Sequence, residues 1–234
     1  MFKKNIPNAI TCCNLICGCI ATSFAFAGNA AWALAFIILG AVFDFFDGMC
    51  ARLLGVSSPI GKELDSLADD VTFGVAPATM VFTLLFQLPY PAALDVVRPY
   101  LPYVAFVIAA FSALRLAKFN LDERQSTSFI GLPTPANALF WGSLIVGGGS
   151  RLVHLQYSLY IILALIVLSC WMLVAEIPLF ALKFKHWGWR GNEVKYVFII
   201  SCIPLLCILG VSGIAVIISW YVVLSLFANS RKEA

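Results

Sequence analysis

The sequence has little charge. Of its 234 residues only 12% are charged and 62% are hydrophobic, and the mean hydropathy is +0.95. A soluble domain of this length carries roughly twice that charged fraction. The composition therefore excludes an ordinary soluble domain. It predicts an integral membrane protein with no room for a second, soluble domain.

Other features are also scarce. No internal repeat, low-complexity segment or coiled-coil heptad is visible. The first apolar stretch is interrupted by polar residues and lacks a clear cleavage site, so we do not expect a signal peptide. Only two histidines are present, both far from the cysteine group near the start, which argues against a zinc site there. Seven of the eight cysteines lie in apolar runs, where reduced cysteine packs as a small hydrophobe.

Long apolar runs, in contrast, occupy most of the chain. One transmembrane helix needs about 20 apolar residues. The sequence predicts an all-α membrane protein with eight such helices, at about residues 8–28, 30–52, 61–87, 101–119, 134–150, 156–182, 194–210 and 212–229. We expect a single membrane domain over residues 1–234, with a six-helix core at 1–185 and two additional helices at 194–229.

Lysine and arginine are distributed unevenly between the two ends of these helices. If the N-terminus is cytoplasmic, thirteen of the fifteen basic residues fall on the cytoplasmic side, and only Arg98 and Arg151 fall outside. A seven-helix alternative moves Arg231 and Lys232 outside and weakens this positive-inside bias. We therefore expect a multi-pass protein of the cytoplasmic (inner) membrane with both termini in the cytoplasm.

Acidic residues are concentrated in one segment. Six of the twelve lie within 27 positions: Asp44, Asp47, Glu63, Asp65, Asp69 and Asp70. Carboxylates at membrane depth are costly and therefore indicate a functional site. Asp44 and Asp47 share one helix face, Asp65 and Asp69 share another, and a short turn makes the two helices antiparallel neighbours. The four aspartates are predicted to face one another at the cytoplasmic helix ends and to hold one or two Mg²⁺ or Mn²⁺ ions.

From Asp44 to Asp69 the spacing is D-x-x-D-G-x-x-A-R-x8-G-x3-D-x3-D. It matches at every fixed position the signature of the CDP-alcohol phosphatidyltransferase family, and the chain is identified as a member by this resemblance. The resemblance implies a helical bundle, a homodimer and a divalent metal bound by the four aspartates, with Asp69 as the general base. It also implies that the CDP moiety lies against Gly48, Ala51, Arg52 and Gly61.

Three other stretches resemble bacterial and archaeal phosphatidylserine synthases of this family. The opening I-P-N-A-I-T-C-C-N-L-I-C-G, from Ile6 to Gly18, resembles their start and implies that Asn8 and Thr11 contact CDP-diacylglycerol. R-L-A-K-F-N, from Arg115 to Asn120, resembles their R-L-A-R-F-N stretch. F-I-G-L-P-T-P, from Phe129 to Pro135, resembles their F-x-G-L-P-x-P element. The resemblance implies transfer of the phosphatidyl group from CDP-diacylglycerol to L-serine, giving phosphatidylserine and CMP.

A serine site needs both signs of charge, because serine carries a carboxylate and an ammonium group. Arg115 or Lys118 is predicted to hold the carboxylate, and Glu176, taken as the only acid of the sixth helix, to hold the ammonium. Asn120, Gly131 and Pro133 complete the candidate serine-binding set.

Two alternatives remain open at this point. A sister enzyme would use glycerol 3-phosphate, inositol or inositol phosphate, and a phosphorylated acceptor should require an additional arginine cluster. A divalent-cation transporter would instead need polar residues that continue across the membrane from Asp69. The segment after Asp69 is nearly apolar, which disfavours transport.

Overall fold

The computed structural model describes residues 2–122, 129–179, 188–189 and 192–233, with side chains described from Asn5 to Phe227 in these ranges except Phe129. The described chain is helical apart from its connections and one pair of two-residue strands, which confirms the predicted all-α class. The elements are α1 (Phe2–Phe26), α2 (Ala30–Leu54), α3 (Pro59–Asp69), η1 (Asp70–Val75), α4 (Ala76–Gln87), η2 (Ala92–Leu94), η3 (Leu101–Phe106), α5 (Val107–Leu121), β1 (Phe129–Ile130), α6 (Thr134–His154), α7 (Ser158–Val174), β2 (Pro178–Leu179), α8 (Glu193–Leu209) and α9 (Ser212–Glu233).

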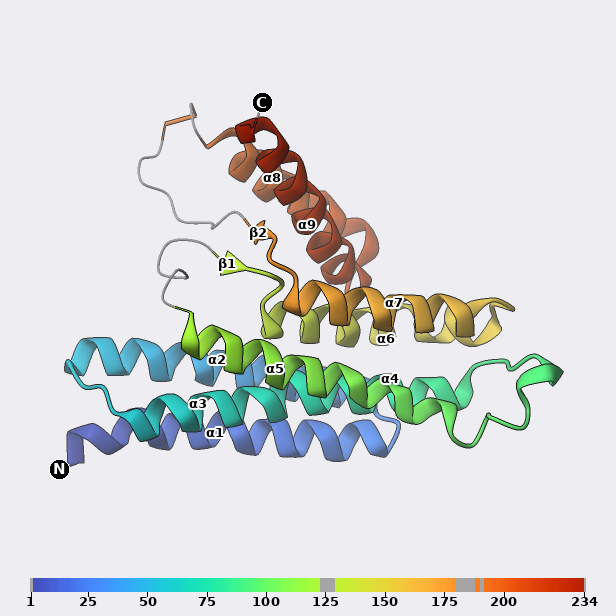
Figure 1. The fold of residues 1–234 in the computed structure, drawn as a ribbon, viewed down its shortest axis with the longest axis horizontal. Coiled ribbons are helices and arrows are strands. Elements are labelled where there is room, and N and C mark those ends of the chain that lie inside the picture. Colours follow the sequence, from blue (N-terminus) through green and yellow to red (C-terminus); the bar gives the residue numbers. More distant parts are fainter. Residues whose placement is uncertain (1, 123–128, 180–187, 190–191, 234) are drawn as a thin grey trace.

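The helices form two layers and a protruding hairpin (Figure 1). In the first layer α1 to α5 run along the long axis, with α1 packed on α2, α3 and α4. α6 and α7 lie along one face of this layer, where α6 contacts α2 and α4, and α7 contacts α5. α8 and α9 form a hairpin that leaves the bundle at an angle, and α9 holds it against α6. The division into a core at 1–185 and two additional helices stays a prediction.

The length and composition of the helices are those of a membrane protein. Four described stretches are long and apolar enough to cross a membrane: Asn5–Phe26, Ala30–Leu54, Pro59–Gln87 and Leu101–Leu121. Two further apolar helices, Ser158–Val174 and Ser212–Phe227, are shorter. Each of the eight predicted segments overlaps at least one helix, while the number of membrane crossings beyond these four stays a prediction.

The helix predicted over residues 156–182 is wrong from residue 175 to residue 179, because α7 ends at Val174, and residues 180–182 lie outside the described ranges. Pro178 lacks a backbone N–H and restricts Ile177 to extended conformations, so the helix cannot continue through this segment. The segment that follows α7 forms hydrogen bonds with the connection after β1 instead. Gly131 N–H donates to the Ile177 carbonyl, and Leu132 N–H donates to the carbonyl of Met172 in the last turn of α7, each at 2.9 Å. β1 and β2 then pair antiparallel.

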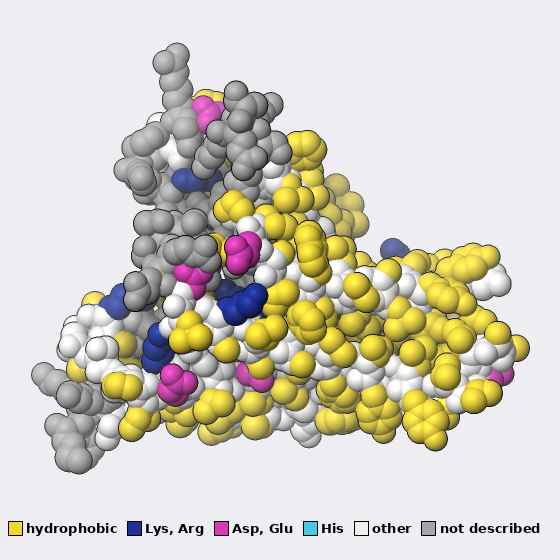
Figure 2. All heavy atoms as spheres, viewed as in Figure 1, with side chains coloured by type: hydrophobic (Ala, Val, Ile, Leu, Met, Phe, Trp, Pro, Cys, Tyr) yellow, Lys and Arg dark blue, Asp and Glu magenta, His cyan; other side chains and the backbone are white. Residues whose placement is uncertain are grey.

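The hydrophobic core lies between the two layers. Trp141 of α6 is fully buried, and its Nε1 donates to Ser169 Oγ of α7 at 3.2 Å. Ile37 of α2 and Phe73 of η1 are also fully buried. On the face that Figure 2 shows, hydrophobic side chains predominate, and most of the visible charged side chains gather toward one end of the bundle. We call this end, where α1 begins and α2 and α5 end, the site end.

Candidate metal and substrate site

A short turn between α2 and α3 brings the acidic segments of two helices together at the site end. α2 ends where Gly55 adopts the left-handed conformation (φ 61°), which favours glycine. α3 begins after Ser58, whose Oγ accepts a hydrogen bond from the Gly61 N–H at 3.0 Å, and Pro59 occupies the first turn. Residues within the turn thus determine where α2 ends and where α3 begins. The short turn keeps the acidic ends of the two helices near each other.

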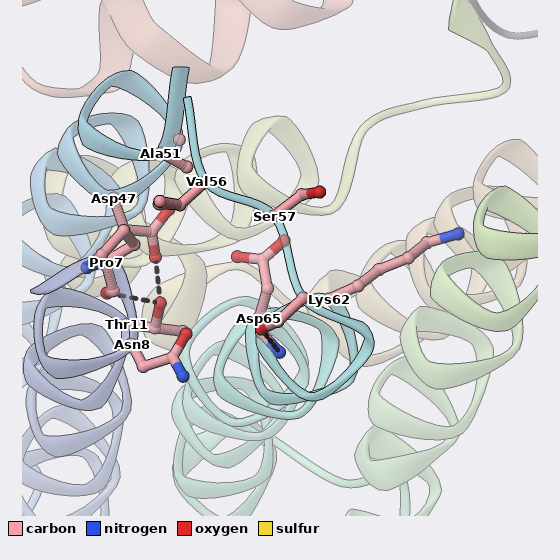
Figure 3. A pocket seen from close by; sticks show the side chains of 12 residues that line it. Pro7, Asn8, Thr11, Asp47, Ala51, Val56, Ser57, Lys62 and Asp65 are labelled. Atoms are coloured by element: carbon pink, nitrogen blue, oxygen red, sulfur yellow. Dashed lines mark hydrogen bonds between the residues drawn. The ribbon is translucent and has the colours of Figure 1, made fainter. Parts of the chain in front are cut away.

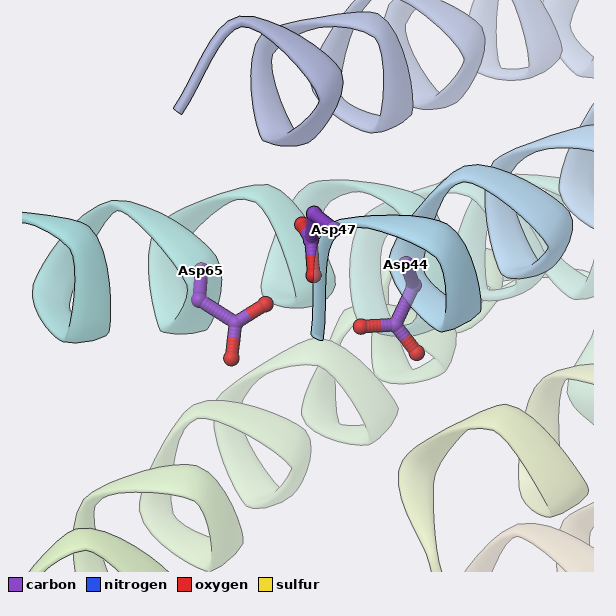
Figure 4. Close-up of side chains that lie close together, drawn as sticks. All are labelled: Asp44, Asp47 and Asp65. Carbon is purple, nitrogen blue, oxygen red and sulfur yellow. The ribbon is translucent and has the colours of Figure 1, made fainter. Parts of the chain in front are cut away.

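Three of the four predicted metal ligands converge. Asp44 and Asp47 on α2 and Asp65 on α3 direct their carboxyl groups into the same space (Figure 4). One carboxylate oxygen from each residue lies within 4.8 Å of those of the other two. The predicted meeting of the two acidic helix faces is therefore present in the structure.

Asp69, the fourth predicted ligand, lies one turn of α3 beyond Asp65, outside the three-carboxylate cluster found among the described residues. Its side chain is 9% exposed, and Asn14 Nδ2 of α1 donates to its Oδ1 at 3.0 Å. The backbone carbonyl of Asn14 in turn accepts from the Thr72 hydroxyl of η1 at 3.0 Å. Asp69 is close enough to interact electrostatically with all three clustered carboxylates. α1 therefore orients Asp69 beside the cluster.

The contact between α1 and η1 requires small residues. An ideal Cβ at Gly18 of α1 would lie 2.8 Å from Thr72 Cα, and one at Gly40 of α2 would lie 2.6 Å from Thr72 Cγ2. Contacts under 3.0 Å force a shift, and at Gly18 the obstacle is backbone. These two glycines therefore allow Thr72 to reach Asn14.

We expect Gly18→Ala to destabilise the fold by about 1–3 kcal/mol, because η1 must move away from the added methyl group. Gly148→Ala is the matched control, since a Cβ there meets no atom within 4 Å. The measurement is thermal unfolding of the purified protein in detergent micelles. A lowered Tm is expected for Gly18→Ala alone, and equal behaviour of the two variants would contradict the proposed packing.

The carboxylate cluster fits a divalent cation. Three negative charges held within 4.8 Å repel one another unless positive charge is supplied between them. Asp65 Oδ1 is buried and has no hydrogen-bond donor among the described residues. A buried charged oxygen without a partner is costly, and hard cations such as Mg²⁺ and Mn²⁺ prefer carboxylate oxygens. Asp44, Asp47 and Asp65 are thus the residues suited to hold the metal.

A cavity of about 200 Å³ opens beside this cluster, between α1, α2 and the start of α3 (Figure 3). It brings together five of the six residues predicted to contact CDP-diacylglycerol, Asn8, Thr11, Gly48, Ala51 and Gly61, along with Asp47 and Asp65. We call it the first cavity. The sixth predicted residue, Arg52, is exposed on the same side of α2. Its Nη1 lies 3.7 Å from the position of an ideal Cβ on Gly48.

Thr11 connects the first cavity to the metal cluster. Its Oγ1 lies 2.6 Å from Asp47 Oδ2 and 3.0 Å from the Pro7 carbonyl oxygen (Figure 3). Because a hydroxyl has one proton, Thr11 donates to one of these two oxygens at a time. The N-terminus of α3 borders the same cavity, and helix N-termini favour bound anions. A cavity with carboxylates for a cation at one side and a helix N-terminus at the other suits a metal-bound diphosphate.

A second cavity, of about 360 Å³, lies between α5, the β1 segment and the end of α7. Its lining includes three of the predicted serine-binding residues, Arg115, Lys118 and Glu176, together with Asp122. Glu176 lies beyond the end of α7 and is exposed, which corrects its predicted place inside a helix. The shortened α7 thus places an acid opposite the two basic residues of α5.

Arg115 connects the second cavity to Asp69. Its side chain is 8% exposed, and its charge interacts with that of Asp69. Nη1 donates to Thr134 Oγ1 of α6 at 3.5 Å, and the guanidinium lies over the Phe119 ring, 5.2 Å from its centroid. These contacts hold a buried cation between the second cavity and the predicted general base.

The other three predicted serine-binding residues are not among those that line the second cavity. Asn120 directs its amide to α3, where Nδ2 donates to Ser66 Oγ at 2.7 Å. Gly131 has φ 74°, and an ideal Cβ on it would lie 3.0 Å from the Leu173 and Ala175 carbonyls. Pro133 directly precedes α6. Direct contact of these three residues with serine stays a prediction.

Sequence reasoning missed Asn14, the group that holds Asp69. The signal was a polar residue in an apolar helix, where a side-chain amide needs a hydrogen-bond partner. Lys62 was also missed. It lines the first cavity but extends its ammonium toward α5, where it donates to the Asn120 carbonyl at 2.8 Å (Figure 3). Both contacts join segments that are more than 50 residues apart in sequence.

An all-α bundle with a carboxylate cluster at one end of its apolar helices defines a membrane protein with a candidate metal site. The chain belongs to the CDP-alcohol phosphatidyltransferase family, whose model matches residues 4–149. This family assignment confirms the resemblance found in the sequence.

Curated relatives carry the name CDP-diacylglycerol–serine O-phosphatidyltransferase. The chain is 41% identical to that of Bacillus subtilis (strain 168) over 131 residues, which are 56% of this chain and 69% of the relative. It is 36% identical to that of Mycobacterium leprae (strain TN) over 142 residues, covering 57% of this chain and 44% of the relative. It is 42% identical to that of Saccharomyces cerevisiae (strain ATCC 204508 / S288c) over 109 residues, covering 43% of this chain and 36% of the relative. The chain thus spans less than half of the mycobacterial and yeast proteins that it matches.

Proposed function

We propose that this protein is an enzyme of phospholipid synthesis that transfers the phosphatidyl group of CDP-diacylglycerol to the hydroxyl of L-serine. The products are phosphatidylserine and CMP. The observation that carries the proposal is the convergence of Asp44, Asp47 and Asp65 next to the first cavity, in a chain of this family. The names of the relatives support serine as the acceptor.

The first cavity is the donor site in this proposal. The diphosphate of CDP-diacylglycerol lies by the N-terminus of α3 and the three carboxylates, and the nucleotide lies against Asn8, Gly48, Ala51 and Gly61. Gly61 leaves room between α3 and α1, because an ideal Cβ on it would lie only 3.0 Å from Asn8 Oδ1. A divalent metal held by the carboxylates, with Asp69 as a further predicted ligand, neutralises diphosphate charge and polarises the phosphorus when bound.

The second cavity is the acceptor site. Among the residues that the structure describes, the charged ones in its lining are two basic residues, Arg115 and Lys118, and two acidic residues, Asp122 and Glu176. This balance of charge matches zwitterionic serine, with the carboxylate at Arg115 and Lys118 and the ammonium at Glu176. A phosphorylated acceptor brings about two negative charges, which the acidic side chains repel. The charge balance therefore favours serine over glycerol 3-phosphate or inositol phosphate.

Asp69 is the general base of the proposed step. It accepts the proton of the serine hydroxyl while that oxygen forms a bond to the phosphatidyl phosphorus. The bond between this phosphorus and the CMP oxygen breaks, and CMP leaves with the electron pair. Asn14 donates to Oδ1 of Asp69, and in this proposal the other carboxylate oxygen takes the proton.

We further propose that the site end faces the cytoplasm in the inner membrane, where serine and the nucleotide are dissolved. The excess of lysine and arginine on that side supports this orientation. The enzyme is proposed to act as a homodimer.

The direct test is to incubate the purified protein with CDP-diacylglycerol and each candidate alcohol in turn and to measure CMP. The alcohols are L-serine, glycerol 3-phosphate, inositol and inositol phosphate. Serine-dependent CMP release, together with phosphatidylserine as the lipid product, is the expected result. CMP release with a different alcohol and none with serine would refute the proposed acceptor.

Arg115→Met should raise the KM for serine roughly 10- to 100-fold, because a charge-assisted contact to the serine carboxylate is lost. Initial rates of CMP release at varied serine and saturating CDP-diacylglycerol measure this effect. Arg151→Met is the matched control, since Arg151 is exposed in the last turn of the same helix that carries Thr134, at the opposite end of the bundle. An unchanged KM for serine in Arg115→Met would remove Arg115 from the acceptor site.

A further inference from the structure

Three residues connect the helix that carries Asp65 and Asp69 to the helix that lines the acceptor site. Lys62 Nζ of α3 donates to the backbone carbonyl of Asn120 at 2.8 Å. The Asn120 side-chain amide of α5 donates back to Ser66 Oγ of α3 at 2.7 Å, and Ser66 Oγ donates to the Lys62 carbonyl at 3.3 Å. We call this closed circuit of Lys62, Ser66 and Asn120 the clasp.

The clasp supplies a hydrogen-bond donor to a backbone carbonyl at the C-terminus of α5. α5 ends at Leu121, so the Asn120 carbonyl belongs to the last turn and has no partner within its own helix. A lysine ammonium near a helix C-terminus supplies the missing donor and also complements the helix dipole. Contacts between α3 and α5 are otherwise sparse, because α5 packs mainly against η1 and α7. Within the described part of the chain, the clasp therefore supplies the hydrogen bonds that join these two helices at the site end.

Both helices of the clasp carry functional side chains next to it. Ser66 directly follows Asp65 on α3, and Asn120 lies two residues after Lys118 and five after Arg115 on α5. Any displacement of α5 relative to α3 therefore moves the basic side of the second cavity relative to the predicted general base.

We propose that Ser66 and Asn120 are positioning residues, and that the clasp sets the distance between the acceptor site and Asp69. This inference rests on the proposed function of the second cavity. It gives Asn120 a role through α3 in place of direct contact with serine.

Removing the side-chain contact of the clasp should weaken serine binding without comparable loss of turnover. Ser66→Ala and Asn120→Ala each remove the same hydrogen bond, so each should raise the KM for serine about 3- to 10-fold. Because the two variants break one contact, the double variant should show no more than the larger single effect. Ser66→Thr keeps the hydroxyl and should restore the wild-type KM.

The controls separate positioning from general damage. Ser219→Ala removes a similar intrahelical hydroxyl contact, to the Ala215 carbonyl at 2.9 Å, in the protruding hairpin, and should leave the KM unchanged. Partial misfolding lowers the active fraction and hence kcat, but it does not change the KM. A KM for serine that stays at the wild-type value in Ser66→Ala and Asn120→Ala overturns the proposal, as do additive effects in the double variant.

The wild-type protein tests the proposed function separately. If it releases CMP with an alcohol other than serine, the serine assignment fails. The same KM comparison is then made with that alcohol, and the clasp is still judged from the ratio of variant to wild type.

Discussion

Chelation of divalent metal with EDTA is expected to stop serine-dependent CMP release, and Mg²⁺ or Mn²⁺ added in excess is expected to restore it. The reason lies in the cluster of Asp44, Asp47 and Asp65, which is suited to hold a cation beside the donor cavity. Without the cation the same carboxylates repel the diphosphate of the substrate. Loss of several kcal/mol of transition-state stabilisation corresponds to a fall of roughly a thousandfold or more in rate.

Direct metal binding gives a second readout for this prediction. Mn²⁺ bound to the purified protein is measurable by electron paramagnetic resonance, and Asp47→Asn should weaken that binding. Asp95→Asn is the matched control, because Asp95 is exposed in the connection between α4 and α5, at the opposite end of the bundle. Full activity after removal of bound metal, or equal Mn²⁺ binding by both variants, would contradict the site as described.

The sequence predicted the acidic half of the site because its geometry is local. Asp44 and Asp47 share a face by their spacing alone, and the short turn with Gly55 and Ser58 keeps the start of α3 near the end of α2. Three of the four predicted ligands accordingly meet within 4.8 Å. A short connection between two regular helices thus carries enough information to place side chains of both.

The rest of the site depends on contacts between distant segments, which the sequence does not specify. Asn14 reaches Asp69 only because α1 packs closely on η1 at Gly18. Glu176 lines the second cavity only because α7 ends early, and that end is determined by Pro178 and by the connection at Gly131 together. The length of the apolar run extended the predicted helix through this segment, because the run alone does not reveal contacts with distant parts of the chain.

Replacement of Asp69 by asparagine is expected to abolish CMP release while leaving CDP-diacylglycerol binding largely intact. The substitution keeps the shape of the side chain, and its amide oxygen still accepts from Asn14 Nδ2, so α1 and α3 keep their contact. What is lost is the ability to take a proton from the serine hydroxyl. General-base catalysis is typically worth roughly 10²- to 10⁴-fold in rate, and we expect a fall in kcat of that size.

Two measurements decide whether this loss is chemical. Binding of CDP-diacylglycerol, followed by its stabilisation of the protein against thermal unfolding, should remain within a few-fold of wild type in Asp69→Asn. Asp95→Asn should show wild-type kcat, because Asp95 lies in the connection at the opposite end of the bundle. The neutral amide cannot act as a base at any pH, so raising the pH should not restore turnover in Asp69→Asn. Turnover like that of the wild type would exclude Asp69 as the base, whereas loss of lipid binding together with kcat would assign it to the metal site alone.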